Sequence, residues 1–302
     1  INNAYIDYQY NAQRRNGYTQ LNGSAFSCLW SDTTYVFARD VDGHLCKFNP
    51  TTWAASTLRT SLNQTIAVTT ALEFKKVNDV IVFSDGITMG IIESGTTVTI
   101  YDLPSLPTTN QQFIDAVIAK YPNDYEQLLS NFGIDVYETI PLAGTCLEYF
   151  NGVLYYAVNN FVFCSKPFNI EKADVRYQVV AGFPDNVSCI HRVNDGLFIG
   201  TTTELYFLEG RGFTFDDNYR QEIAGRLTGG FTQRQVLNYG ITKGSGVRVN
   251  GSYIPDLNTI TTVVLCASPI GILALKDNGI YYNLSSQQIT LPTGTRATAF
   301  FS

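Results

Sequence analysis

Short apolar runs separated by turn residues recur along the 302-residue chain and give the first expectation about its fold. Four clear copies, each with two apolar runs around a tight turn, occupy residues 33–49, 77–93, 150–166 and 193–210, and weaker copies occupy 236–254 and 269–285. The first two copies begin 44 residues apart (33 to 77), and the third and fourth begin 43 apart (150 to 193). A period near 40 whose unit is a strand hairpin predicts a β-propeller with one four-stranded blade per repeat.

Asn-Gly and Asp-Gly dipeptides lie between runs rich in Val, Ile, Tyr and Phe in these repeats, and they predict tight hairpin turns. They are Asp42-Gly43, Asp85-Gly86, Asn151-Gly152, Asp195-Gly196, Asn250-Gly251 and Asn278-Gly279, and Asn159-Asn160 adds a further turn. We therefore expect residues 1–302 to form a single all-β domain, a β-propeller of about six blades (five to seven). The N- and C-terminal strands should share one blade, because that closure leaves the ring without an open edge.

Residues 108–136 interrupt the pattern between the second and third repeats with helical spacing of apolar residues. Pro122 separates two predicted helices, and Gly133 is placed to end the second. This helical insertion is either a decoration packed on the propeller rim or a docking element for a neighbouring subunit. The candidate subunit-contact residues on it are Phe113, Ile114, Val117, Tyr121, Leu128 and Phe132.

The composition is that of an ordered, sheet-forming protein, with 45% apolar and 15% charged residues and 19 each of Tyr and Phe. The net charge is −6 and the pI about 4.9. Because Lys and Arg are not clustered, we do not expect the protein to bind nucleic-acid phosphates, although DNA could pass along such a surface without binding to it. No apolar run approaches the ~18 residues of a membrane span, and no signal peptide is visible at residues 1–20.

The six cysteines are widely separated and lie mostly in apolar strand patterns, which favours buried reduced thiols over disulfides, although the even count allows either. No catalytic set, cofactor motif or metal motif stands out, so we expect no enzyme activity. His44, at a predicted turn, and His191, beside an apolar strand, are expected to be structural or solvated.

Two alternatives to a structural role stay open. Propeller glycosidases place paired carboxylates at the ring centre, and the acids near the repeat starts that could converge there are Asp32, Asp79, Glu148, Asp185 and Asp195. A glycan-binding module would use an exposed aromatic residue such as Trp53, whereas Trp30 lies in a strand expected to be core.

Two end segments resemble a group of bacteriophage virion proteins. The first runs from Asn11 to Leu21, with Arg14-Arg15-Asn16-Gly17-Tyr18 at its centre, followed by Cys28-Leu29-Trp30-Ser31. That group has an R-R-P-G-[FY] stretch before an L-W-S-like strand, and here Asn16 replaces the proline. The second comprises Ser268-Pro269-Ile270-Gly271-Ile272, then Asn283-Leu284, Pro292-Thr293-Gly294 and Ala297-Thr298-Ala299. It is similar to the S-P-x-G-I … N-L-T … P-x-G … G-A-A ending of the group.

The resemblance implies a propeller-containing nozzle protein of a short-tailed phage tail, made in the host cytoplasm and built into the virion. Such proteins form rings, of six copies in that family, below the head-to-tail adaptor, and enclose the channel through which DNA leaves. No catalysis and no cofactor are implied. Copies of the chain, the adaptor and other tail proteins are the expected partners, and DNA would pass without specific contact. The helical insertion is not part of the family pattern.

Overall fold

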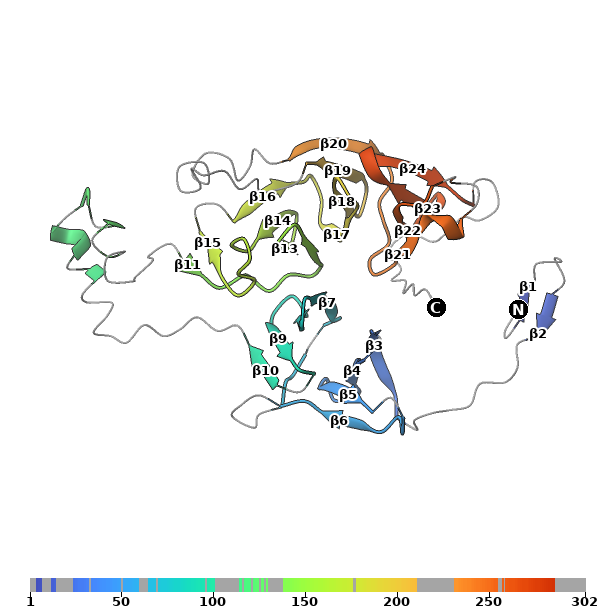
Figure 1. The fold of residues 1–302 in the computed structure, drawn as a ribbon, viewed down its shortest axis with the longest axis horizontal. Helices are drawn as coiled ribbons and strands as arrows, with labels where there is room; N and C mark the ends of the chain where they lie inside the picture. The colour runs from blue at the N-terminus through green and yellow to red at the C-terminus, as the bar shows by residue number, and fades with distance from the viewer. Residues whose placement is uncertain are drawn as a thin grey trace.

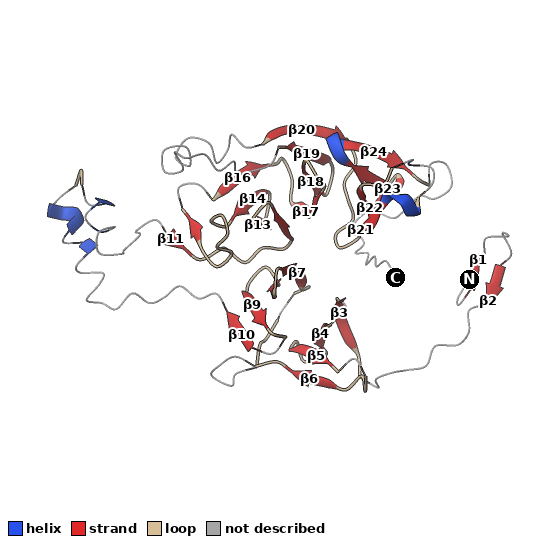
Figure 2. Cartoon of the chain, viewed as in Figure 1, coloured by secondary structure: helices blue, strands red, loops and turns tan. Residues whose placement is uncertain are grey.

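The computed structural model describes residues 4–6, 12–14, 24–100, 114–129, 138–210 and 231–285. Short gaps within these ranges fall at 33, 50, 60–64, 69, 96, 116, 121, 125, 128, 176–177, 255–256 and 258. The described residues are mainly β-strands arranged in several antiparallel sheets, which confirms the all-β prediction (Figure 2).

Five of these sheets have four strands, and every paired strand is antiparallel to its neighbour. The first sheet contains β3 (Phe26–Ser31), β4 (Val36–Asp40), β5 (Leu45–Phe48) and β6 (Ala55–Thr57). The second contains β7 (Glu73–Val77), β8 (Val80–Ser84), β9 (Met89–Glu93) and β10 (Thr97–Ile100). The third contains β12 (Leu147–Phe150), β13 (Val153–Val158), β14 (Phe161–Cys164) and β16 (Val179–Gly182). The fourth contains β17 (Val187–Arg192), β18 (Gly196–Thr201), β19 (Leu205–Glu209) and β20 (Thr232–Leu237). The fifth contains β21 (Val247–Asn250), β22 (Thr262–Ser268), β23 (Gly271–Lys276) and β24 (Ile280–Asn283).

Outside the helical insertion, the structure also has four shorter strands and two short 3-10 helices. β1 (Ala4–Ile6) pairs with β2 (Ala12–Arg14), and β11 (Glu138–Thr139) pairs with β15 (Ala173–Asp174). The 3-10 helices are η1 (Gly251–Tyr253) and η3 (Asp277–Gly279). The remaining N- and C-terminal residues, on which the predicted shared blade depends, lie outside the described residues.

The sheets follow one another in chain order, with the first strand of each on the inner side of an arc and the fourth on the outer side (Figure 1). The inner strand β12 of the third sheet contacts both β7 of the second sheet and β17 of the fourth. Among the described residues, no apolar cluster joins the fifth sheet to the first, so these sheets form an arc whose closure stays a prediction.

Apolar clusters fill the space between sheets that are successive in the chain. Neighbouring residues of one strand enter different clusters because side chains alternate across a sheet. In β13, Tyr155 packs toward the fourth sheet and Tyr156 toward the second. In β18, Ile199 packs toward the third sheet and Phe198 toward the fifth. Burial on both faces explains why the sequence shows continuous apolar runs where a one-sided sheet would show alternation.

Two of the predicted Asn-Gly dipeptides form tight hairpin turns with the expected backbone, whereas Asn250-Gly251 lies at the start of η1 and Gly196 has no positive φ. Asn151 and Gly152 both have positive φ, of 49° and 82°, between β12 and β13. Asn278 and Gly279 repeat this at 59° and 63° between β23 and β24. Two successive residues with positive φ give the primed turns whose twist matches a β-hairpin, and Asn-Gly adopts them with little strain.

The four clear sequence repeats are equivalent in the structure, because each forms the second and third strands of a sheet (β4–β5, β8–β9, β13–β14 and β18–β19). The two weaker repeats were assigned wrongly. Residues 236–254 run from the end of β20 to η1 and join two sheets, and residues 269–285 hold the third and fourth strands of the fifth sheet. The equivalent hairpin is β22–β23. Its turn is Ser268-Pro269-Ile270-Gly271, which carries no Asn-Gly or Asp-Gly signal.

Candidate functional site

Charged side chains gather on the inner strands of the second, third and fourth sheets, with Glu148 of β12 at their centre. The Glu148 side chain is fully buried and forms an ion pair with Lys75 of β7. Its second oxygen, Oε2, accepts the backbone N–H of Arg192 of β17 at 3.3 Å, and Arg192 Nε lies 3.9 Å from Oε1. One carboxylate therefore joins three sheets at the inner side of the arc.

The cations around Glu148 decide its protonation. Burial raises the pKa of the Glu148 carboxyl, but the charges of Lys75 and Arg192 outweigh burial and leave the pKa below its ordinary value. An ionised, doubly engaged carboxylate is poorly suited to act as a general acid. Of the acids predicted to converge at the centre, Glu148 lies on an inner strand, β12. Its ion pairs with Lys75 and Arg192 indicate a structural role.

The other acids in that predicted group have separate partners. Asp32 pairs with Lys76 at 2.6 Å, Asp185 accepts the hydroxyl of Thr202, and Asp195 accepts the backbone N–H of Asn278. Asp79 is exposed in the turn between β7 and β8. The structure therefore does not bring these acids together as a catalytic pair, and the glycosidase alternative gains no support from them.

His191 lies beside Glu148 on β17, and its Nε2 atom is buried without a hydrogen-bond partner among the described residues. The ring packs so closely on Gly246 that a Cβ added there would lie 1.6 Å from Nε2. Burial lowers the pKa of His191 to about 4, with Lys75 and Arg248 adding to the shift and Glu148 opposing it. His191 is therefore held neutral inside the protein, in agreement with a structural role.

We expect this histidine to make the protein sensitive to mild acid. Because the folded-state pKa lies below the ordinary value of 6.5, the unfolded chain takes up the proton first as the pH falls. Between pH 7 and pH 5 the free energy of unfolding should drop by about 2 kcal/mol through this residue. Denaturant titrations at both pH values measure it. His191→Phe should remove most of the drop, and the matched variant His44→Phe should retain it. An equal drop in both variants would contradict this role.

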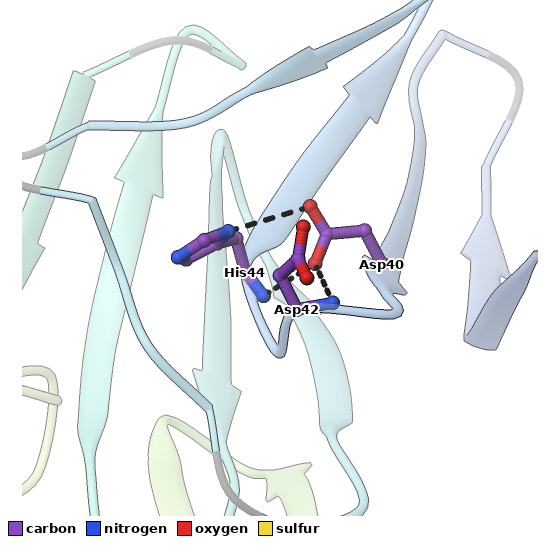
Figure 3. A group of neighbouring side chains, drawn as sticks. All are labelled: Asp40, Asp42 and His44. Carbon is purple, nitrogen blue, oxygen red and sulfur yellow. Dashed lines mark hydrogen bonds and ion pairs between the residues drawn. The ribbon is translucent and has the colours of Figure 1, made fainter. Parts of the chain in front are cut away.

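The second cluster comprises Asp40, Asp42 and His44, whose ligand atoms lie within 4.8 Å of one another (Figure 3). Asp40 Oδ1 accepts the backbone N–H groups of Asp42 at 3.0 Å and His44 at 2.7 Å. Its Oδ2 lies 3.5 Å from His44 Nδ1 and accepts the Cys46 thiol. Burial raises the pKa of Asp40, but these hydrogen bonds hold it below the ordinary value. The cluster is accounted for as the hydrogen-bonded turn between β4 and β5.

In equivalent turns of other sheets, a side-chain oxygen likewise accepts two backbone N–H groups of its own turn, which supports a structural role for Asp40. Asp85 Oδ1 accepts the N–H groups of Ile87 and Thr88 between β8 and β9. Thr201 Oγ1 accepts those of Thr203 and Glu204 between β18 and β19. The Asp40 turn therefore belongs to a repeated local structure.

The predicted helical insertion lies between the second and third sheets, and its described residues 114–115, 117–120, 126–127 and 129 are helical. Figure 2 draws these turns to one side of the sheets. Of the candidate contact residues, Ile114 is buried and Val117 is half-buried, while Phe113, Tyr121, Leu128 and Phe132 lie outside the described residues. Leu129, which is not among the candidate contact residues, is fully buried.

The chain returns from the insertion at β11, which is fixed to the third sheet. β11 pairs with β15, and Glu138 forms ion pairs with Lys166 at 3.0 Å and Lys172 at 2.6 Å. Burial raises the pKa of Glu138, but the two lysines outweigh it and hold the pKa below its ordinary value. The base of the insertion is thus held in place independently of its helices.

The remaining predictions about side chains concern cysteines and tryptophans. None of the six cysteines forms a disulfide, and all except the half-buried Cys28 are buried, which confirms the prediction of buried reduced thiols. Trp30 is half-buried and stacks on Phe37 and Phe74 against the apolar cluster between the first and second sheets, so it belongs to the core in part. Trp53 is half-buried near Phe48, so it presents only part of its ring to a glycan. None of the helices in the described part of the chain is long and apolar enough to cross a membrane.

Comparison with known proteins gives no family. No protein-family model matches the chain, and no curated protein sequence does. Among solved structures, the computationally designed Ika8 protein is 12% identical with a TM-score of 0.44, over 89% of this chain and 64% of Ika8. The extracellular domain of the putative hybrid two-component system BT4673 from B. thetaiotaomicron is 13% identical with a TM-score of 0.45, over 91% of this chain and 29% of that one. The Cps50 (Swd1) β-propeller domain from Myceliophteria thermophila is 8% identical with a TM-score of 0.42. The match covers 91% of this chain and 76% of the Cps50 domain. At TM-scores below 0.5, these likenesses do not establish a shared fold.

Proposed function

We propose that the chain is a structural subunit of a phage tail, a nozzle-like ring protein around the DNA exit channel, and that it performs no catalysis. The observation that carries this proposal is the pair of end motifs, Arg14-Arg15-Asn16-Gly17-Tyr18 and Ser268-Pro269-Ile270-Gly271-Ile272, which resemble those of nozzle proteins. The carboxylates Glu148, Asp32 and Asp185 agree with it, because their ion pairs and hydrogen bonds account for them without a reaction.

We further propose that the domain is a closed propeller of about six blades. Five four-stranded meanders in chain order, with an apolar cluster between each successive pair, support this. On one face of the fifth sheet, Val249, Val263 and Ala274 are buried in a cluster with Leu257, and a further blade would pack on this side of the sheet. The sequence patterns at the two chain ends supply candidate strands for that blade.

Symmetric assembly completes the proposal. The family resemblance suggests six copies in a ring, in contact with the head-to-tail adaptor and other tail proteins. A closed ring needs a patch on one subunit that meets a different patch on the next. The helical insertion, drawn to one side of the sheets, is the element best suited to provide one such patch.

Mass spectrometry of purified virions tests the proposed function. We expect the chain at a fixed number of copies per particle, near six, and enriched in isolated tails compared with heads. A chain found only in the cytosol of infected cells, or absent from purified particles, would contradict a virion role. Hydrolysis of an oligosaccharide that is abolished by Glu148→Gln would instead favour the glycosidase alternative.

A further inference from the structure

A cavity of about 610 Å³ opens at one end of the inner strands. Its lining comes from equivalent positions of four sheets: the segment before the first strand and the turn between the second and third strands. The turns contribute Ile87, Asn159, Thr202 and Pro269. Because each sheet is an antiparallel meander, these two parts of every sheet lie at the same end of the arc. The cavity is therefore a product of the repeated architecture, and its volume falls in the range of small-molecule sites.

The walls of the cavity are mainly apolar. Val187, Ile241 and Pro269 line it, and Ile87 is 68% exposed beside them. All the lining residues belong to the described part of the chain, and none is aromatic. Without a ring on which a sugar could stack, the cavity favours a ligand with an aliphatic or compact apolar body over a glycan.

Lys243 is the cationic residue in the lining, and within the described structure no carboxylate pairs with its ammonium group. Nearby acids are engaged elsewhere. Asp85 accepts backbone N–H groups of its own turn, and Asp185 accepts the Asn186 N–H and the Thr202 hydroxyl. The ammonium group is thus left for a ligand, since the local carboxylates already have partners.

The inner strands next to the cavity carry further cations, most of which are already in ion pairs. Although the whole chain has a net charge of −6, the inner strands β7, β12, β17 and β21 carry more cations than acids. The cations are Lys75, Lys76, Arg192 and Arg248, and the acids are Glu73 and Glu148. Lys75 and Arg192 pair with Glu148, and Lys76 pairs with Asp32, so among the lining residues Lys243 supplies the cation for a ligand.

We propose that this cavity binds a small organic anion, with its apolar body against Val187, Ile241 and Pro269 and its anionic group on Lys243. A carboxylate, a sulfonate or a phosphate monoester would satisfy the same contacts. The proposal is independent of the phage-tail role, because it depends only on the cavity and its charge.

Isothermal titration calorimetry of the full chain with hexanoate, benzoate, hexyl phosphate and neutral hexan-1-ol tests the proposal. At least one anion should bind with one site per chain, and hexan-1-ol should bind at least about tenfold more weakly, as expected for the loss of a charge-assisted hydrogen bond. Lys243→Met and Lys243→Gln should each weaken binding of the anion by a similar factor, about tenfold, and Lys243→Arg should retain most of the affinity.

Lys276→Met is the matched control, because Lys276 ends β23 and lies outside the cavity lining. It should bind the anion as the parent does. Absence of binding by all three anions, equal binding of hexanoate and hexan-1-ol, or unchanged affinity in Lys243→Met and Lys243→Gln would each overturn the proposal. In amide hydrogen-exchange measurements, the bound anion should slow exchange of the backbone N–H groups at residues 240–243. This protection would locate the ligand in the cavity.

Discussion

Replacing Glu148 with Gln should lower the free energy of unfolding by about 3 kcal/mol. The substitution removes the charge that Lys75 and Arg192 share at the junction of three sheets, and it leaves two partly buried cations side by side. Glu148 is fully buried, so water cannot replace the lost interaction. Denaturant unfolding of the purified chain at neutral pH measures the change.

Glu93→Gln is the matched control, since Glu93 is exposed at the end of β9. It should stay within about 0.5 kcal/mol of the parent, as surface substitutions usually do. A double-mutant cycle with Glu148→Gln and Lys75→Met should give a coupling energy of about 1 kcal/mol or more, as residues in direct contact do. Equal stability of Glu148→Gln and the parent would show that the ion pair does not hold the three sheets together.

Replacing residues 108–136 with a short Gly/Ser linker should abolish entry into the tail and leave the fold intact. Loop-closure entropy changes by only about 0.6 kcal/mol per doubling of loop length, so the linker itself costs little. The return point at β11 remains, because Glu138 and its two lysines lie outside the replaced segment. Thermal melting and complementation of a phage lacking the chain measure the two effects.

A single change in the insertion provides the control for that deletion. Asp124→Asn alters an exposed residue between the helical segments and should complement normally. If the deletion variant is insoluble or loses its β-sheet circular dichroism, the insertion belongs to the core and the docking role is wrong. Normal complementation by a folded deletion variant would equally exclude a docking role.

The hairpins could be predicted from the sequence because their strands are buried on both faces. Such strands form continuous apolar runs, as in Val80–Ser84 and Gly196–Thr201, and the first two hairpins also turn at Asp42-Gly43 and Asp85-Gly86. The fifth hairpin was misplaced because its own turn contains Pro269. The Asn278-Gly279 signal belongs to the next turn along, so it shifted the prediction by one strand.

The inner strands were harder to predict because their polar residues find partners only in other sheets. Glu148 appeared in the sequence as one acid among several near the repeat starts, and its pairing with Lys75 spans 73 residues of chain (75 to 148). The cavity was missed for the same reason, since its lining comes from eight short segments without a motif in common. Long-range contacts of this kind leave no local pattern in one sequence.

Electron cryomicroscopy of purified virions tests the central claim most directly. We expect a ring of six copies below the head-to-tail adaptor, in which each copy shows five four-stranded sheets and a sixth that closes the propeller with strands from both chain ends. The helical insertion should contact a neighbouring subunit. Tails without density for this chain, or a subunit whose sheets form an open arc, would contradict the account.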